Sequence, residues 1–220
     1  MTPYCLVLLD FDGTLADTRP SVVFSMRHTF AELGGPLPGE EAIRATIGLP
    51  LARGIATLHP DLPAGEVSAW VARYRAIYAE RAAPLTRLFS GAVETLHRLA
   101  EAGLALAVVS NKAQGPLELA VAEFGLAGLV AVAVGERPNG PAKPDPAFFE
   151  SGVRPHFPDV AASQVLMVGD TEVDLAFARG IGADACFAAY GYGRPEACRA
   201  LDPRHTIARI ADLCAVLGLD

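Results

Sequence analysis

The run of residues 6–14, Leu-Val-Leu-Leu-Asp-Phe-Asp-Gly-Thr, constrains the fold of this chain more than any other stretch. Its four consecutive aliphatic residues are typical of a strand that is buried on both faces, as in a parallel sheet. The strand ends in two acids, Asp10 and Asp12. Because ligands of open α/β sheets bind beyond the carboxyl ends of the strands, these acids are candidates for a functional site.

Two carboxylates held close together repel each other unless a cation or a shared proton offsets their charge. A simpler interpretation is that Asp12-Gly13 marks a turn and that both acids are solvated. Such a turn leads into a second alternating strand, but residues 15–33 have a helical pattern instead. We therefore interpret the two acids as part of a functional site.

A block of helices is expected directly after this first strand. Thr18 can act as the N-cap of a helix with Pro20 in its first turn, and the glycines at 34 and 35 end that helix. Further helices are expected at residues 40–47, 51–58 and 66–81. Residues 16–85 are therefore predicted to form a small, all-helical inserted domain.

From residue 90 onward the pattern alternates between helix and strand. Helices are expected at 91–101, 114–124, from 145 and at 173–179, strands at 104–109, 129–134, 165–168 and 185–189, and a short strand and helix within 206–217. This alternation predicts an α/β fold with a doubly wound, mostly parallel, Rossmann-like sheet. The expected core is residues 1–15 and 86–220, and a chain of 220 residues with 51% hydrophobic residues is long enough for both parts.

Polar residues follow two further strands or occupy a loop of this core. Ser110 and Asn111 end the strand at 104–109, where a hydroxyl and backbone N–H groups can hold a phosphate oxygen, although Ser-Asn after a strand is more often a helix cap. Lys143 lies in a proline-rich loop and is one of only two lysines, against sixteen arginines. A lone loop lysine is usually a surface charge, but an ammonium group here would neutralise a phosphoryl group or a carboxylate.

Asp170 and Asp174 follow the strand at 165–168. Their spacing of four residues brings both toward one face of a helix. Carboxylate oxygens of this kind suit Mg²⁺. The alternative is that Asp170 only caps the helix and Asp174 is exposed.

Taken in order, these motifs resemble those of the haloacid dehalogenase superfamily. The first is Asp10-Phe-Asp12-Gly-Thr, and Ser110, Lys143 and the acids Asp170 and Asp174 match the second, third and fourth. The resemblance covers essentially the whole chain, and it implies that residues 16–85 are a helical cap of the type called C1.

The resemblance also implies a Mg²⁺-dependent phosphatase that works through an aspartyl-phosphate. Asp10 would be the nucleophile and Asp12 the general acid and base. The metal would be held by Asp10, the backbone carbonyl of Asp12 and Asp170, with Asp174 either as a further ligand or as an anchor for the ligands. The phosphoryl group would contact a set drawn from three motifs, namely Gly13, Thr14, Ser110, Asn111 and Lys143.

Residue choices separate branches of the superfamily. Dehalogenases lack the second aspartate, and phosphonoacetaldehyde hydrolases and many sugar-phosphate mutases use a cap lysine, which residues 16–85 do not contain. The later Gly191-Tyr192-Gly193 and the sequence after Lys143 resemble the phosphoglycolate phosphatase group. A pyrophosphatase, a nucleotide or sugar-phosphate phosphatase and, outside the enzymes, a receiver-like signalling domain remain alternatives.

The expected substrate is a small phosphorylated metabolite, and Arg19, Arg44 and Arg53 are candidates for contact with its carboxylate. The net charge of −7 argues against a nucleic-acid partner. The apolar run at the N-terminus is too short and too acidic for a membrane span or a signal peptide. Four scattered cysteines favour a reducing compartment, so a cytoplasmic protein is expected.

Overall fold

The computed structural model describes residues 2–219, and a six-stranded sheet forms its centre. The strands are β1 (Leu6–Leu9), β4 (Ala105–Ala113), β5 (Val132–Glu136), β6 (Val165–Gly169), β7 (Asp184–Ala188) and β8 (His205–Ile207). They lie in the order β5-β4-β1-β6-β7-β8, and every pair is parallel. The predicted doubly wound α/β sheet is confirmed.

The register of the three central strands places their carboxyl ends at one edge. Leu9, the last residue of β1, pairs with Val108 of β4 and with Val168 of β6. All four residues of β1 are buried, as the aliphatic run requires. The residues that follow each strand therefore meet at the same edge of the sheet.

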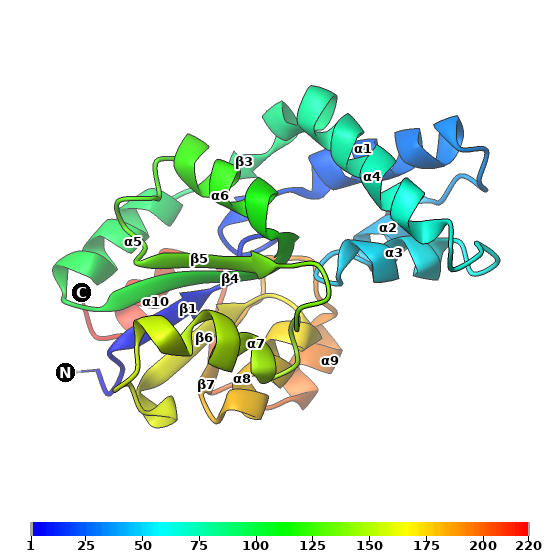
Figure 1. Ribbon diagram of the computed structural model, residues 1–220. Coiled ribbons are helices and arrows are strands. Elements are labelled where there is room, and N and C mark those ends of the chain that lie inside the picture. Colours follow the sequence, from blue (N-terminus) through cyan, green and yellow to red (C-terminus); the bar gives the residue numbers. More distant parts are fainter. Residues whose placement is uncertain (1, 220) are drawn as a thin grey trace.

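Helices cover both faces of the sheet (Figure 1). One hydrophobic cluster joins the sheet to α5 (Ala92–Glu101), α6 (Gln114–Glu123) and α10 (Asp212–Val216). A second cluster lies on the opposite face under α7 (Ala147–Gly152) and α8 (Glu172–Ile181). The short helix α9 (Pro195–Ala200) packs against α8. Both termini lie at the end of the molecule away from the inserted helices.

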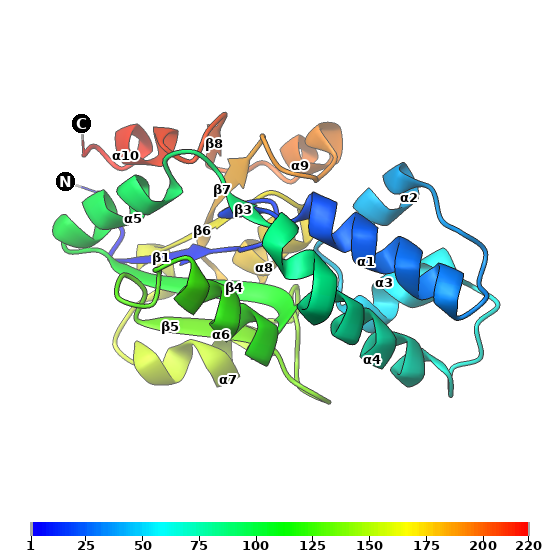
Figure 2. The same ribbon diagram turned by 90° about the horizontal axis from the view of Figure 1, so that it is seen from above.

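The inserted helices form a body beside the sheet with a hydrophobic cluster of their own (Figure 2). They are α1 (Arg19–Glu32), α2 (Glu40–Arg44), α3 (Leu51–Leu58) and α4 (Val67–Ile77), followed by a π-helical turn η1 (Tyr78–Ala82) and a 3₁₀ turn η2 (Ala83–Leu85). Phe30 and Trp70 meet edge to face in that cluster, with ring centroids 4.9 Å apart. This body is held together by side chains that the sheet does not share.

A two-stranded antiparallel ribbon connects this body to the core. It consists of β2 (Ala16–Asp17) and β3 (Arg87–Leu88), which the helical pattern of the insertion did not predict. Strands of two residues are too short to show hydrophobic alternation. They form because the segments that enter and leave the insertion lie side by side. Several expected boundaries also differ: β5 begins at Val132 rather than 129, and β4 continues through Lys112 to Ala113.

The start of α1 corrects the expected capping. Thr18 occupies the N-cap position, but its side chain makes no capping hydrogen bond and its buried hydroxyl has no partner. The hydroxyl of Tyr192 instead accepts hydrogen bonds from the backbone N–H groups of Thr18 (2.8 Å) and Arg19 (3.0 Å). A distant loop of the core thus satisfies the first donors of the helix.

Within residues 2–219, no helix is both long and apolar enough to cross a membrane.

Candidate active site

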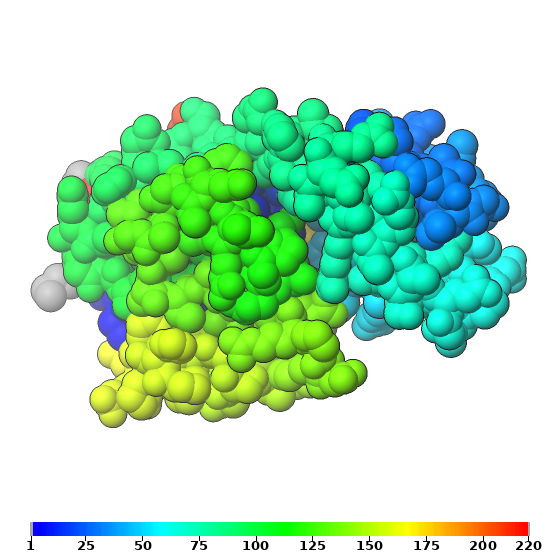
Figure 3. All heavy atoms as spheres, turned by 45° about the horizontal axis from the view of Figure 1, so that its top comes forward, coloured from blue at the N-terminus to red at the C-terminus, as the bar shows by residue number. Residues whose placement is uncertain are grey.

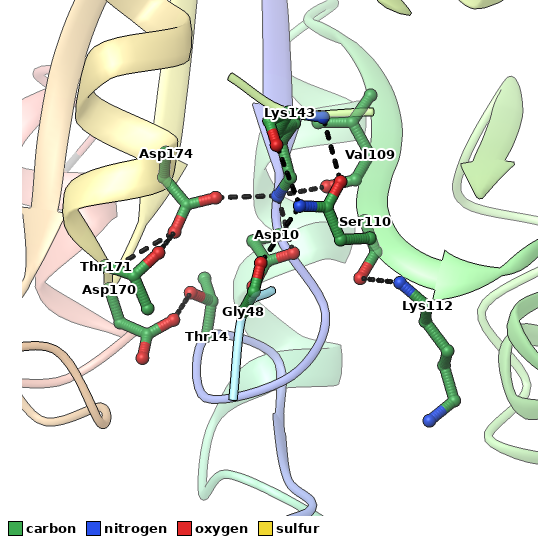
Figure 4. Close-up of polar contacts among 11 residues, drawn as sticks. Asp10, Thr14, Gly48, Val109, Ser110, Lys112, Lys143, Asp170, Thr171 and Asp174 are labelled. Atoms are coloured by element: carbon green, nitrogen blue, oxygen red, sulfur yellow. Dashed lines mark hydrogen bonds and ion pairs between the residues drawn. The ribbon is translucent and has the colours of Figure 1, made fainter. Parts of the chain in front are cut away.

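Three buried carboxylates gather where β1 and β6 end and α8 begins (Figure 4). One oxygen from each of Asp10, Asp170 and Asp174 lies within 4.8 Å of the others. As whole residues, the three acids are at most 3% exposed. Asp174 is therefore not the exposed acid that the alternative interpretation of this motif required.

The ammonium group of Lys143 lies between two of these acids. Its Nζ is 2.8 Å from Asp10 Oδ1 and 2.6 Å from Asp174 Oδ1. A third hydrogen bond of 2.8 Å goes to the carbonyl oxygen of Val109. Burial favours the neutral amine, but the two carboxylates raise the pKa of Lys143 above its ordinary value, so the group stays charged.

One ammonium does not neutralise three carboxylates. Burial, together with Asp174 and Asp12, raises the pKa of Asp10 to about 7 even though Lys143 opposes the shift. Burial and the neighbouring acids also raise the pKa of Asp170 well above its ordinary value. The cluster of hard oxygen ligands with excess negative charge fits a divalent cation such as Mg²⁺.

This charge excess predicts how stability depends on pH when no metal is present. The pKa of Asp10 is about 7 in the folded protein and an ordinary 3.8 in the unfolded chain. Asp10 therefore contributes fully to the free energy of unfolding below pH 3.8, and this contribution is lost as the pH rises to about 7. The free energy of unfolding in EDTA is expected to fall over this range, as measured by urea denaturation. An Asp10→Asn variant should show a smaller fall, and an equal fall in both proteins would contradict the assignment.

Thr14 and the backbone of Tyr192 hold Asp170 in place, and Gly13 leaves room for it. The Thr14 hydroxyl donates to Asp170 Oδ1 at 3.0 Å, and the Tyr192 backbone N–H donates to Asp170 Oδ2 at 2.7 Å. Gly13 has a φ of +91°, and a Cβ there would lie 2.4 Å from Asp170 Oδ2. The side chain of Thr14 thus bonds to a candidate metal ligand, and its predicted contact with a phosphoryl group remains a prediction.

Asn111 is likewise engaged by the protein. Its amide nitrogen donates to the carbonyls of Lys143 (3.0 Å) and Gly48 (2.9 Å), and its oxygen accepts from the Lys143 N–H at 2.8 Å. The side chain therefore fixes the lysine loop and joins it to the inserted helices. The buried Ser110 precedes Asn111 at the same strand end.

Asp12 lies apart from the three clustered acids. Its carboxylate oxygen Oδ1 is 3.4 Å from the Nζ of Lys112, which lies on β4. Asp10 and Asp12 both line a cavity of about 230 Å³ between the core and the inserted helices. Asp12 thus faces space in which a leaving group can sit.

The three cap arginines predicted from sequence do not line this cavity. Arg44 bonds to the carbonyl oxygen of Tyr192 at 2.9 Å and to Glu41, and the side chains of Arg19 and Arg53 are exposed. The cations that do line the cavity are Arg75 and Lys112. Lys112 is the other of the two lysines and directly follows Ser110-Asn111, a signal that could have singled it out.

Tyr192, the central residue of Gly191-Tyr192-Gly193, bonds to Asp170, to Asp17 and to the start of α1. Its hydroxyl donates to Asp17 Oδ1 at 2.7 Å and accepts the two N–H groups at the start of α1. Tyr192→Phe removes all three bonds and is expected to lower the free energy of unfolding by about 1–3 kcal/mol. Urea denaturation with constant m-value tests this.

Tyr190→Phe is the matched control for that variant. The Tyr190 hydroxyl donates a hydrogen bond of 2.7 Å to the carbonyl oxygen of Thr14, compared with the three hydrogen bonds of the Tyr192 hydroxyl. Its loss should cost about 1 kcal/mol. If Tyr192→Phe were no more destabilising than Tyr190→Phe, the hydrogen bonds at the start of α1 would not contribute the expected free energy of unfolding.

Comparison with known proteins is consistent with this geometry. The family model of haloacid dehalogenase-like hydrolases matches residues 7–188. A phosphoglycolate phosphatase of Cupriavidus necator is 34% identical over 98% of this chain and 94% of its own length. One of Rhodospirillum rubrum is 32% identical over 86% of this chain and 80% of its own.

A solved structure has the same fold across its whole length. The crystal structure of a predicted phosphoglycolate phosphatase from Haemophilus somnus superposes with a TM-score of 0.87 at 25% identity, covering 98% of this chain and 99% of that one. The fold and the family matches define a phosphoric monoester hydrolase, as the sequence predicted. The chain belongs to the haloacid dehalogenase-like hydrolase family.

Proposed function

We propose that this protein is a Mg²⁺-dependent phosphatase that hydrolyses a small phosphomonoester through an aspartyl-phosphate on Asp10. The observation that carries the proposal is the buried group of Asp10, Asp170, Asp174 and Lys143 at the edge of the sheet. Its charges and its position beside a cavity suit a dianionic phosphoryl group held with a metal.

Each residue has a distinct task in this reaction. A carboxylate oxygen of Asp10 attacks phosphorus in line with the departing oxygen, while Lys143 offsets the charge of the phosphoryl group. Asp12, which faces the cavity, protonates the leaving alkoxide and then takes a proton from the water that hydrolyses the intermediate. Ser110 and the backbone at Gly13 and Asn111 would contact the phosphoryl oxygens.

Asp10, Asp170, Asp174 and the backbone carbonyl of Asp12 would hold the Mg²⁺. When bound, the ion supplies positive charge that screens the repulsion between carboxylate and phosphoryl group. Asp170 is anchored by Thr14 and by the Tyr192 N–H, which fix its orientation toward the cluster.

We further propose that residues 16–85 act as a cap over the active site, with residues 1–15 and 86–220 as the catalytic core. The helices of the insertion supply one wall of the cavity and contact the core through Gly48 and Arg44. A wall of this kind excludes water from the leaving group during transfer.

For the substrate we propose phosphoglycolate or a close analogue, because relatives at 34% and 32% identity are named phosphoglycolate phosphatases.

We also propose that the protein is cytoplasmic, because the free thiols of Cys5, Cys186 and Cys198 suit a reducing compartment.

The test is kcat/KM, with and without Mg²⁺, over 2-phosphoglycolate, pyrophosphate, sugar phosphates and nucleoside monophosphates. We expect metal-dependent turnover with 2-phosphoglycolate preferred. A preference for another phosphate ester of the panel would contradict the proposed substrate but not the proposed mechanism. A stable phosphoprotein without turnover would instead support a receiver-like signalling domain.

A further inference from the structure

The cavity beside Asp12 has two walls of different origin. Figure 3 shows a hollow where the helical segment around α4 and η1 faces α6 of the core. Much of the lining is apolar, and its apolar members include Val22, Met26, Leu49, Leu51 and Phe124. Its charged members are Asp10, Asp12, Arg75, Lys112 and Glu123, of which Arg75 and Glu123 are exposed.

Lys112 is the cation of this lining that lies deep beside the reacting groups. Its side chain is only 10% exposed, and Figure 4 shows it extending away from the cluster that Lys143 serves. Its Nζ lies 3.4 Å from Asp12 Oδ1 and 3.3 Å from the hydroxyl oxygen of Tyr78. The ammonium also lies 4.5 Å from the centroid of the Tyr78 ring.

These contacts leave Lys112 with capacity for a ligand. An ammonium group has three hydrogens, and Asp12 and Tyr78 account for two of them. The ammonium is buried beside one carboxylate and one hydroxyl, where water does not compete strongly for its remaining hydrogen. Tyr78 belongs to the inserted helices and Lys112 to β4, so the pair exists only where the two walls meet.

We propose that Lys112 and Tyr78 form the subsite for a carboxylate on the leaving group. Asp12 is placed to protonate the leaving oxygen, and the Lys112 ammonium is 3.4 Å from that acid. A carboxylate one carbon removed from the leaving oxygen therefore comes within reach of the third hydrogen of Lys112. This subsite rests on the proposed phosphatase function and selects short 2-phospho acids within it.

The test compares two substrates of equal length, 2-phosphoglycolate and 2-hydroxyethyl phosphate, which lacks the carboxylate. In Lys112→Gln we expect kcat/KM for 2-phosphoglycolate to fall about 10- to 100-fold more than for 2-hydroxyethyl phosphate, since a charge-assisted hydrogen bond is lost. Inhibition by free glycolate should weaken by a similar factor. Arg27→Gln, which removes an exposed cap cation outside the cavity, should leave the ratio of the two substrates unchanged.

Tyr78→Phe keeps the ring and removes only the hydroxyl, so it provides a second test if Lys112→Gln fails to fold. It should lower the ratio of kcat/KM for 2-phosphoglycolate to that for 2-hydroxyethyl phosphate by about 3- to 10-fold. An equal loss for both substrates would show that Lys112 only positions Asp12 and would overturn the subsite, as would a wild-type enzyme that turns over both substrates equally. Absence of turnover with every phosphomonoester would overturn the proposed function itself.

Discussion

Asp10→Asn is expected to reduce phosphate release by at least about 10⁴-fold with every substrate, because an amide oxygen cannot form the aspartyl-phosphate. The variant is nearly isosteric, and Lys143 keeps its bonds to Asp174 and to the Val109 carbonyl. The protein should therefore remain folded. Steady-state phosphate release and trapping of the phosphorylated protein by acid quench measure the two consequences.

The control for Asp10→Asn is Asp159→Asn, which alters an exposed acid away from the cavity. It should retain the activity of the unaltered protein. Thermal unfolding of both variants in EDTA separates a chemical loss from a folding defect. Near-normal Mg²⁺-dependent turnover by Asp10→Asn would refute its role as the nucleophile.

Lys143→Gln is expected to lower both stability and activity. The Lys143 side chain is 2% exposed and its ammonium is paired with Asp10 and Asp174, so its removal leaves two buried carboxylates without a protein cation. Loss of one partner from a buried ion pair costs about 3–5 kcal/mol. Turnover should fall by at least about 10³-fold, since the phosphoryl charge also loses its partner.

Urea denaturation in EDTA and in Mg²⁺ distinguishes the two effects of Lys143→Gln. Added Mg²⁺ should restore part of the stability, because binding to the folded state stabilises it, but it should not restore turnover. A second variant, Lys143→Gln with Asp174→Asn, removes one of the uncompensated charges and should be more stable than Lys143→Gln in EDTA. If the double variant were less stable than the single one, charge imbalance would not be the cause.

Sequence sufficed for the parts of the site that depend on strand ends. The aliphatic runs before Asp10, Ser110 and Asp170 predict parallel strands, and parallel strands end at one edge of a sheet. Leu9 does pair with Val108 and Val168, so the meeting of these residues follows from local patterns alone.

The hydrogen bonds between side chains of different loops could not be predicted from those patterns. The side chains of Thr14 and Asn111 bond to Asp170 and to the Lys143 loop, which the sequence did not predict. Neither bond has a periodic signature, since each joins residues whose distance depends on how two loops are placed. The same holds for the ribbon of β2 and β3, whose two-residue strands are too short to show alternation.

The run at residues 6–14 by itself determined a buried strand, an acidic edge and the type of chemistry expected there. Only the tertiary structure separated the two acids, placing Asp10 against Lys143 and Asp12 against Lys112. Only the tertiary structure also brought the Tyr192 hydroxyl to the start of α1, 174 residues away from Thr18 in sequence. Hydrophobic periodicity specifies elements one at a time, whereas a hydrogen bond between distant loops depends on the packing of all the elements between them.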